Sequence, residues 1–256
     1  MTQSAEVLPD PDEAAKRRSR DLCACISEAC EQQGGSIAFS EFMHMALYQP
    51  GLGYYTGGLQ KFGAAGDFIT APEVSSLFSQ CVARQAAQVL NEMEQAEMLE
   101  FGAGSGIMAA DVLLELERLH ALPTHYYIVE LSAELRQRQK QTIKHRAPHL
   151  MEMVQWLDAL PEDAIQGVIV ANEVLDAMPV ECFRVIDGAV EQMRVLARVG
   201  QLKAVYAEAD EAVLEQVRII ERRREKAFDD GYCSEFNPVV KAWLASLYAV
   251  LDLSLI

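Results

Sequence analysis

The sequence predicts an α/β fold built on a doubly wound, largely parallel β-sheet. From residue 98 onward, short apolar runs alternate with amphipathic stretches of helical periodicity, a pattern typical of parallel strands joined by crossover helices. A glycine-rich turn stands between the first apolar run and the first helical stretch, as in nucleotide-binding folds of this class. Residues 98–180 are therefore predicted to form the α/β core. Its expected strands are 98–101, 126–131, 154–157 and 167–171, and its expected helices are 107–122 and 132–147.

The rest of the chain is predicted to divide into further segments around this core. Ser40 is expected to cap a helix that Pro50 ends, and another helix is expected over residues 75–95. A turn at Asp187-Gly188 predicts antiparallel strands on either side of it. The segments are a mobile tail (1–20), an N-terminal helical region (21–97) with a site-covering loop (49–75), a β-rich insertion with a helix (181–230) and a return to the core (231–256).

The C-terminal residues suggest an incomplete sheet. After an amphipathic helix, the chain stops where an apolar strand is starting, at Leu251. This strand is expected beside residues 167–171, so the sequence predicts that C-terminal strands are missing. The run 167–171 would then be an unpaired apolar edge, and residues 1–256 alone are expected to be unstable or self-associating.

Composition limits the classes of partner. Lys and Arg number 22 against 38 Asp and Glu, a formal net charge of −16, which opposes binding to nucleic acid. The six cysteines form no CxxC pair and the five histidines no HExxH motif, so no metal site is predicted. No apolar run approaches the ~20 residues that span a bilayer, and no signal-peptide core opens the chain. A cytoplasmic protein without membrane insertion is predicted; a mitochondrial location would need a targeting segment beyond this sequence.

The strongest motif is EFGAGSG at residues 100–106, placed where a strand ends and a helix begins. Glycines there let backbone amides approach a nucleoside ligand closely and let the helix pack against the strand. A dinucleotide fingerprint would need a glycine at position 107, where Ile107 stands, and an acidic residue near the turn suits a cationic sulfonium. The motif therefore predicts S-adenosylmethionine in preference to NAD. The expected contacts are Glu100, Gly102, Gly104 and Gly106.

Carboxylates follow two further strands of the predicted sheet. Glu130 ends the run YYIVE, where a carboxylate can accept hydrogen bonds from both ribose hydroxyls of an adenosine. Asp158 follows the run VQWL, where it could face the adenine edge. An ordinary aspartate turn explains Asp158 nearly as well, so both interpretations stay open.

The segment NEVLDAMP, at residues 172–179, directly follows the apolar run GVIVA. Ligands of open α/β sheets bind beyond the carboxyl ends of the strands, so polar residues here should face the reacting group. We expect Asn172 to contact the cofactor, and Glu173 and Asp176 to face the methyl acceptor. Helix capping by Asn172 with two solvated acids is the alternative.

Together these motifs resemble the MidA family of bacterial and mitochondrial proteins, over about residues 37–179 and again at 234–238. The matching motifs are GLGYY (51–55), GDFITAPEVS (66–75), EFGAGSG (100–106) and NEVLDAMP (172–179). The resemblance implies a Rossmann-like class I methyltransferase fold with an N-terminal helical region, S-adenosyl-L-methionine as cofactor, and methylation of protein arginines. It also implies a protein partner, since mitochondrial members assist assembly of respiratory complex I by methylating one of its subunits. It assigns Gly102, Gly104, Gly106 and Glu130 to the cofactor, and Asp67, Thr70 and Glu73 to a loop that covers the site.

An arginine acceptor sets clear demands on the site. Transfer from a sulfonium is an in-line displacement, so the protein mainly orients the reactants and excludes water. Carboxylates can localise the guanidinium charge on one nitrogen, and Glu173, Asp176 and Glu73 are the acids available. A small-molecule acceptor would instead need a base, for which Tyr54 or Tyr55 is the candidate.

Protein-arginine methyl transfer is the main functional prediction, and two alternatives remain. One is a cofactor-binding assembly factor or chaperone for a respiratory or other complex, without turnover. The other is a nicotinamide-dependent oxidoreductase, which Ile107 opposes.

Overall fold

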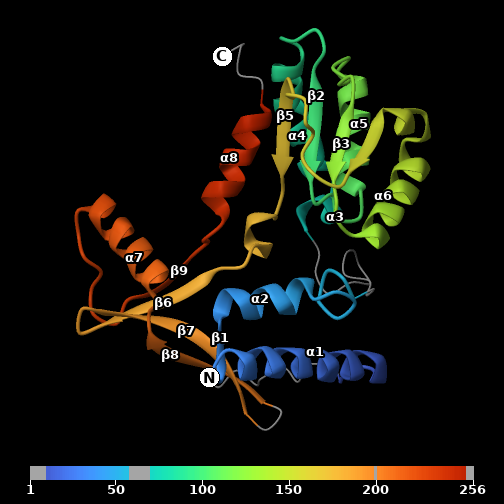
Figure 1. Cartoon of the computed structure of the whole chain (residues 1–256). Coiled ribbons are helices and arrows are strands. Elements are labelled where there is room, and N and C mark those ends of the chain that lie inside the picture. Colours follow the sequence, from blue (N-terminus) through green and yellow to red (C-terminus); the bar gives the residue numbers. More distant parts are fainter. Residues whose placement is uncertain (1–9, 58–69, 199–200, 252–256) are drawn as a thin grey trace, which may run out of the picture. The chain divides into compact units, whose positions relative to one another are not determined.

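The computed structural model describes residues 10–57, 70–198 and 201–251. By their contacts, the described residues divide into two compact units. The antiparallel unit joins the described residues of 1–57 with those of 179–238, and the parallel unit joins the described residues of 58–178 with those of 239–256. Figure 1 labels the helices and strands of each unit.

A four-stranded parallel sheet forms the centre of the parallel unit, in the order β4-β3-β2-β5. Leu99 of β2 lies between Tyr127 of β3 and Ile169 of β5. The carboxyl ends of all four strands therefore meet at one edge of the sheet, as the sequence predicted. The strands are β2 (Glu97–Phe101), β3 (Tyr126–Val129), β4 (Val154–Leu157) and β5 (Gly167–Ala171).

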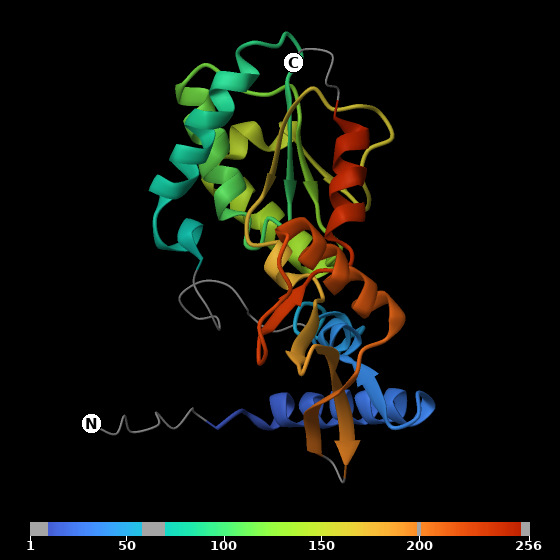
Figure 2. The same ribbon diagram turned by 90° about the vertical axis from the view of Figure 1, so that its left-hand side faces the viewer.

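Helices cover both faces of this sheet, which confirms the predicted doubly wound fold. On one face α4, α5 and α6 enclose the main core with strand residues such as Met98 and Tyr126. On the other face α8 packs Trp243 against Phe101, with 5.3 Å between the ring centroids. Figure 2 shows the strands between α8, in red, and the teal and green helices α4 and α5. The elements are α3 (Ala71–Val74), α4 (Ser76–Leu90), α5 (Ile107–Arg118), α6 (Ala133–Arg146) and α8 (Val240–Val250), with 3-10 turns η1 (Pro148–Met153) and η2 (Leu175–Ala177).

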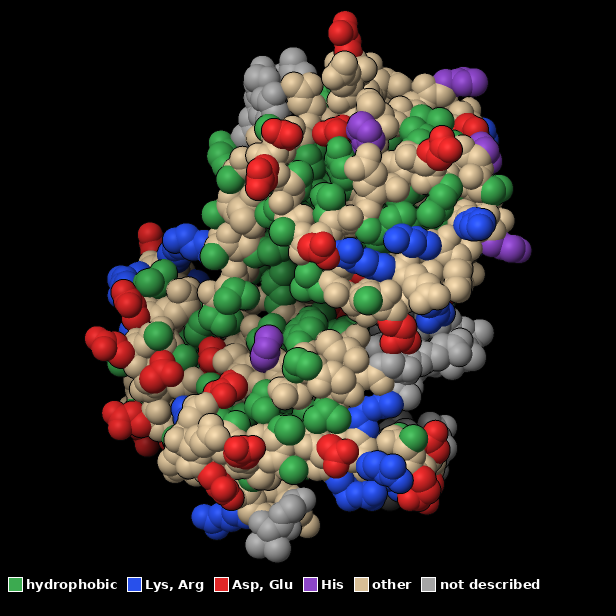
Figure 3. All heavy atoms as spheres, turned by 45° about the vertical axis from the view of Figure 1, so that its right-hand side comes forward, with side chains coloured by type: hydrophobic (Ala, Val, Ile, Leu, Met, Phe, Trp, Pro, Cys, Tyr) green, Lys and Arg blue, Asp and Glu red, His purple; other side chains and the backbone are tan. Residues whose placement is uncertain are grey.

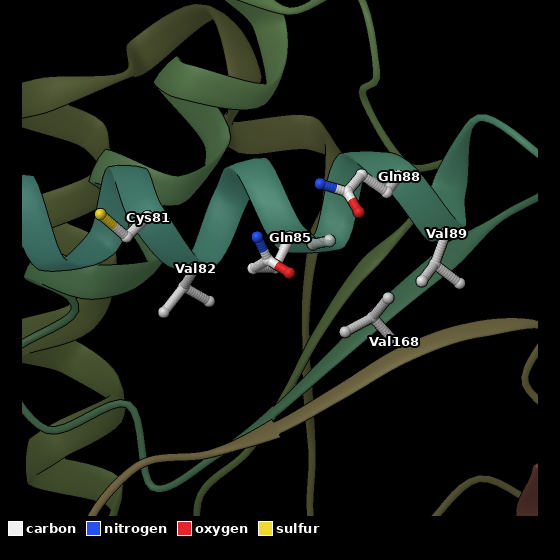
Figure 4. Close-up of a pocket in the computed structure, with 7 residues that line it drawn as sticks. Cys81, Val82, Gln85, Gln88, Val89 and Val168 are labelled. Atoms are coloured by element: carbon white, nitrogen blue, oxygen red, sulfur yellow. The ribbon is translucent and has the colours of Figure 1, made fainter.

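A groove of about 520 Å³ runs between α4 and the strand β5. Its described lining residues come from these two elements, with Val82 and Val89 on α4 and Val168 on β5 (Figure 4). None of them belongs to the glycine-rich turn or to the segment that follows β5. The groove is therefore distinct from the candidate site described below.

An antiparallel sheet joins the N-terminal segment of the chain to residues 181–236. Its order is β1-β7-β6-β9, and β8 also pairs with β7. The predicted turn between β6 and β7 is confirmed: φ is 50° at Asp187 and 76° at Gly188, as in a type I′ hairpin. The elements are α1 (Glu13–Gln32), β1 (Ser36–Ala38), α2 (Phe39–Tyr48), β6 (Glu181–Ile186), β7 (Ala189–Arg198), β8 (Gln201–Glu208), α7 (Glu211–Arg224) and β9 (Cys233–Phe236).

Two predictions for the N-terminal segment are wrong. Residues 13–20, assigned to a mobile tail, form the first turns of α1, because the Asp12 side chain caps the helix by accepting a hydrogen bond from the amide of Ala15 (2.7 Å). Ser40 does not cap α2, which begins at Phe39. The Ser40 hydroxyl instead donates a hydrogen bond to the carboxylate of Glu181 in β6.

The segments predicted around the core are also distributed differently. Residues 21–97 contribute to both units, since their first part packs in the antiparallel unit and α4 belongs to the parallel unit. The strands of 181–208 share a sheet with β1, so they are not a self-contained insertion. β9 pairs with β6 instead of returning to the core, and α8 makes that return.

The chain past α8 continues toward the start of β5. Leu251 forms a parallel bridge with Ile165, two residues before β5 begins. Among the described strands, β5 is the last in the order of the parallel sheet. The strand expected after Leu251 lies outside the described residues.

Candidate functional site

The glycine loop follows β2 and is held in left-handed backbone conformations. φ is 60° at Gly102, 54° at Gly104 and 84° at Gly106, values that residues with a Cβ rarely adopt. A Cβ added at Gly106 would also lie 2.8 Å from the Cα of Gln139, so α6 packs on the loop at a distance that only glycine permits. The loop ends at the N-terminus of α5, where backbone amides without intrahelical partners can meet a ligand.

Glu130 follows β3, and 8% of the residue is exposed. Its Oε1 accepts a hydrogen bond from the amide of Ser132 (2.9 Å), and its Oε2 accepts one from Nε2 of Gln139 (3.0 Å). A carboxylate offers about four lone-pair sites, so about two remain for a ligand. The same Nε2 donates to the carbonyl of Gly104 (3.2 Å). The structure thus brings together the glycine loop and the carboxylate expected to bind the ribose.

Glu100 lies on the core face of β2, with 1% of the residue exposed. The Tyr126 hydroxyl donates a hydrogen bond of 2.6 Å to its Oε2. Burial raises the pKa of Glu100 from 4.5 to about 7, against the opposing effect of the Tyr126 hydrogen bond. Its contact with a cofactor stays a prediction, because a carboxyl with a pKa raised by burial occurs at functional sites and in buried structural networks alike.

We expect Glu100→Gln to stabilise the protein at about pH 8 and to change its stability little at about pH 4. The pKa of Glu100 is higher in the folded than in the unfolded protein, so the folded state favours the protonated carboxyl. The resulting stabilisation is fully present below the unfolded pKa and is lost as the pH rises through about 7, the folded pKa. The loss amounts to about 3 kcal/mol in the free energy of unfolding.

Glutamine at position 100 stays neutral and can still accept the Tyr126 hydrogen bond. Urea unfolding of both proteins across this range measures the difference, and a gap that does not widen with pH contradicts the assignment.

Asp158 follows β4 and is exposed, and its carboxylate forms an ion pair of 2.5 Å with Arg136. Arg136 also donates to the backbone carbonyls of Glu130 (2.6 Å) and Leu157 (2.7 Å). It therefore ties the ends of β3 and β4 together. The ion pair with Arg136 supports the interpretation of Asp158 as an ordinary turn residue. A contact between Asp158 and an adenine edge stays a prediction.

The segment after β5 runs beside the glycine loop. Val174 belongs to a core cluster, and its Cγ2 lies 3.5 Å from the position that a Cβ of Gly102 would occupy. Asn172 is half-buried, whereas Glu173 and Asp176 are exposed. Glu173 has a φ of 52°, a left-handed conformation that is rare outside glycine and clusters at functional sites. The two exposed acids thus belong to a segment that Val174 anchors beside the glycine loop.

Glu73 comes from α3, at the end of the predicted covering loop. Its carboxylate accepts a hydrogen bond from the hydroxyl of Ser105 in the glycine loop. Thr70 precedes α3, and its carbonyl accepts hydrogen bonds from the amides of Glu73 (3.0 Å) and Val74 (3.2 Å). Glu73 was predicted to hold the acceptor; its observed contact is with the loop predicted to bind the cofactor. Asp67 lies outside the described residues.

The sequence interpretation did not find three residues that organise this site. They are Gln139, which joins the glycine loop to Glu130, Arg136, which joins two strand ends, and Tyr126, which binds Glu100. Gln139 left one signal in the sequence, because it stands four residues from both Leu135 and Ile143 on the buried side of α6. A polar residue in such a stripe is costly unless its hydrogen bonds are satisfied.

The described residues offer few signs of other ligand classes. Within them, no cluster of three or more His, Cys, Asp and Glu side chains could hold a metal ion. None of their helices combines the length and the apolar character needed to cross a membrane. On the face drawn in Figure 3, acidic and basic side chains are interspersed, which does not favour a phosphate backbone there.

Comparison with known proteins decides the family. A family model described as "Putative S-adenosyl-L-methionine-dependent methyltransferase" matches residues 81–253, more than half of the chain. The chain belongs to this family. The match covers the glycine loop, Glu130 and the segment after β5, and confirms the methyltransferase family and the cofactor predicted from the sequence.

Relatives of this methyltransferase family extend the comparison. Mitochondrial proteins named protein arginine methyltransferase NDUFAF7, or its homolog, are 29% identical over 183 residues in Drosophila melanogaster and 28% identical over 176 residues in Danio rerio. These alignments cover 63% and 59% of this chain and 41% of each relative.

Two crystal structures from Burkholderia thailandensis share the fold over 96% of this chain. One, bound to S-adenosyl-homocysteine, has a TM-score of 0.87 and is 38% identical; the other, a native structure, has a TM-score of 0.82 and is 37% identical. The alignments cover 63% and 62% of those chains, so this chain spans only part of the length of its relatives.

The site residues fit this cofactor. The glycine loop adopts conformations open to a close-lying nucleoside, and the buried Glu130 carboxylate retains lone pairs for ribose hydroxyls. No phosphate-binding glycine follows Gly106, since α5 begins with Ile107. S-adenosyl-L-methionine, which has no pyrophosphate, matches this set of groups better than a dinucleotide does.

Proposed function

We propose that this chain transfers the methyl group of S-adenosyl-L-methionine to an arginine side chain of a protein. The observation that carries the proposal is the joining of the glycine loop to Glu130 through Gln139, beside a segment that exposes Glu173 and Asp176. The arginine acceptor is supported by the names of the NDUFAF7 relatives. The protein that carries the arginine would be a subunit of a respiratory complex or another protein. The sequence favours the cytoplasm as the compartment.

The cofactor residues have separable tasks in this proposal. When bound, the cofactor supplies a sulfonium methyl group with a good leaving group. Glu130 would accept hydrogen bonds from the ribose hydroxyls, and the glycine loop would let the rest of the nucleoside lie close to its backbone. Asn172, half-buried directly after β5, would also contact the cofactor. Glu73 would keep α3 on the glycine loop through its hydrogen bond with Ser105.

The exposed acids would act on the acceptor. A guanidinium is protonated at all working pH values, so a carboxylate can draw its charge toward one nitrogen and leave the other nitrogen more nucleophilic. Glu173 and Asp176, which are exposed after β5, would take this role. As the new N–C bond formed, the S–C bond of the sulfonium would break and its electron pair would stay on the sulfur of the departing S-adenosylhomocysteine. The methylated nitrogen would lose a proton, which an exposed carboxylate can receive directly or through water.

The test is methyl transfer from tritiated cofactor. The purified chain is incubated with an extract of host cells that lack its gene, and the labelled protein is hydrolysed and searched for methyl-arginine. Label in methyl-arginine, suppressed by excess S-adenosylhomocysteine, is the expected result. Cofactor binding without any methylated product would instead support an assembly factor without turnover. Label confined to small molecules would refute the protein acceptor.

We expect Glu130→Ala to weaken S-adenosylhomocysteine binding by about 1.5 to 3 kcal/mol, the cost of charge-assisted hydrogen bonds to two hydroxyls. Calorimetric titration measures this loss. Glu134→Ala, which removes an exposed acid from the same stretch of chain, is the matched control and should bind as the unaltered protein does. Equal affinities of the two variants would show that Glu130 does not bind the ribose.

A further inference from the structure

Gln139 connects three parts of the parallel unit through one buried amide group. Its Nε2 donates hydrogen bonds to the carbonyl of Gly104 (3.2 Å) and to Oε2 of Glu130 (3.0 Å). Its Oε1 accepts a hydrogen bond from Nε1 of Trp156 in β4 (2.9 Å). The residue is 0% exposed, so little water competes for these partners.

The three partners permit only one orientation of the amide. If the amide were flipped, its oxygen would face two acceptors, the Gly104 carbonyl and the Glu130 carboxylate. Its nitrogen would then face the Trp156 N–H, which can only donate. The chemistry of the surrounding groups therefore fixes how Gln139 points.

The backbone of Gln139 is fixed as well. The Cβ that a side chain at Gly106 would add lies 2.8 Å from Cα and 3.2 Å from the carbonyl oxygen of Gln139, so helix and loop are in direct contact. The neighbours of Gln139 on the buried side of α6 are Leu135 and Ile143. An apolar residue would suit that stripe, and burying an amide there is costly unless every polar atom has a partner.

We propose that Gln139 is a positioning residue that holds the glycine loop and the Glu130 carboxylate in one geometry for cofactor binding. Two acceptors, the Gly104 carbonyl and Oε2 of Glu130, share its single NH₂ group. If the NH₂ group were removed, the Gly104 carbonyl and the Glu130 carboxylate would lose this hydrogen-bond donor. The cost of their desolvation and their mutual repulsion would then push them apart. The inference rests on the proposed cofactor function and adds a residue that no sequence motif marks.

The decisive variant is Gln139→Glu, with S-adenosylhomocysteine binding measured by calorimetry from about pH 6 to about pH 8.5. The introduced carboxylate can still accept from Trp156, but it places a second negative charge against Glu130. We expect binding to be at least about 10-fold weaker at the upper pH. As the pH falls, the two carboxyl groups take up a shared proton, a donor is restored, and the affinity should recover.

Among the described residues, three other charged groups contact Glu130 or the partners of this network. Arg136 donates to the backbone oxygen of Glu130, Asp158 pairs with Arg136, and Nζ of Lys140 lies 5.0 Å from the centroid of the Trp156 ring. They are common to all variants, so they cancel in the comparison with a control. Gln141→Glu is that control, because Gln141 is exposed on the same helix and the charge change is the same.

The control should bind within about 2-fold of the unaltered protein at each pH, since an exposed charge is well screened. A Gln139→Glu variant that follows Gln141→Glu at every pH would overturn the proposal. Gln139→Met removes the hydrogen bonds without adding charge, so its affinity should be lower than that of the unaltered protein and should not recover as the pH falls. This variant tests the proposal if Gln139→Glu does not fold. Wild-type affinity in Gln139→Met would also overturn the proposal. Failure of the unaltered protein to bind would refute the proposed function itself, which is a separate result.

Discussion

Replacing Gly106 by alanine is expected to abolish S-adenosylhomocysteine binding and to lower the free energy of unfolding by about 2 to 4 kcal/mol. Gly106 has a φ of 84°, and an added Cβ would lie 2.8 Å from the Cα of Gln139. Because a backbone atom cannot rotate away, α6 would have to shift. That shift would draw the Gln139 amide away from Gly104 and Glu130. Calorimetric titration and urea unfolding measure the two losses.

The matched control for this variant is Gly188→Ala. Gly188 has a similar φ of 76°, but no heavy atom lies within 4 Å of its Cβ position. Backbone strain alone should cost about 1 kcal/mol there, with no change in cofactor binding. Gly106→Ala would contradict the structural argument if it bound the cofactor and was no less stable than the control.

The parallel sheet could be predicted from the sequence because its signals are local. Val154–Leu157 and Gly167–Ala171 are short apolar runs with polar or turn residues on either side, and both were predicted with the observed bounds. The glycine loop was recognisable for the same reason, since its conformation depends on residues next to one another in the chain.

The antiparallel unit depends on distant partners instead. β1 has three residues, and its central residue Ile37 pairs with Val195 of β7. β9 is four residues long and pairs with β6, although the chain then continues into the parallel unit. So short a strand carries little periodicity, and its propensity does not identify its partner. The hairpin at Asp187-Gly188 was therefore predicted, whereas the starts of α1 and α2 and the sheet that joins these elements were not.

The site was only partly predictable for a related physical reason. Residue types at strand ends made Glu130 and the acids after β5 candidates, since topology alone brings strand ends to one edge. The role of Gln139 depends on the packing of α6 onto Gly106 and on the rotation of one side chain. No pattern of residue types specifies such a contact. Likewise, nothing in the sequence indicated that Glu73 would bond to Ser105.

Replacing Glu173 by glycine is expected to slow methyl transfer by about 100-fold or more, and yet to raise the free energy of unfolding by about 0.5 to 1 kcal/mol. Glu173 is exposed and has a φ of 52°, so the backbone bears a conformational strain that glycine would relieve. If the Glu173 carboxylate orients the acceptor, a glutamate is needed at this position in spite of the backbone strain. The protein then gives up some stability for activity. Transfer from tritiated cofactor and urea unfolding give the two measurements.

Glu173→Gln separates the charge of Glu173 from its backbone conformation. Glutamine keeps the strained turn and the length of the side chain, so its stability should match that of the unaltered protein, while transfer falls as it does in the glycine variant. Both variants should bind S-adenosylhomocysteine within about 2-fold of the unaltered protein, because an exposed, solvent-screened carboxylate contributes little to a ligand held elsewhere. Glu162→Gln, another exposed acid of the parallel unit, should change neither property. Normal transfer by the glycine variant would mean that the Glu173 carboxylate does not act in transfer, and would leave Asp176 as the acid to test.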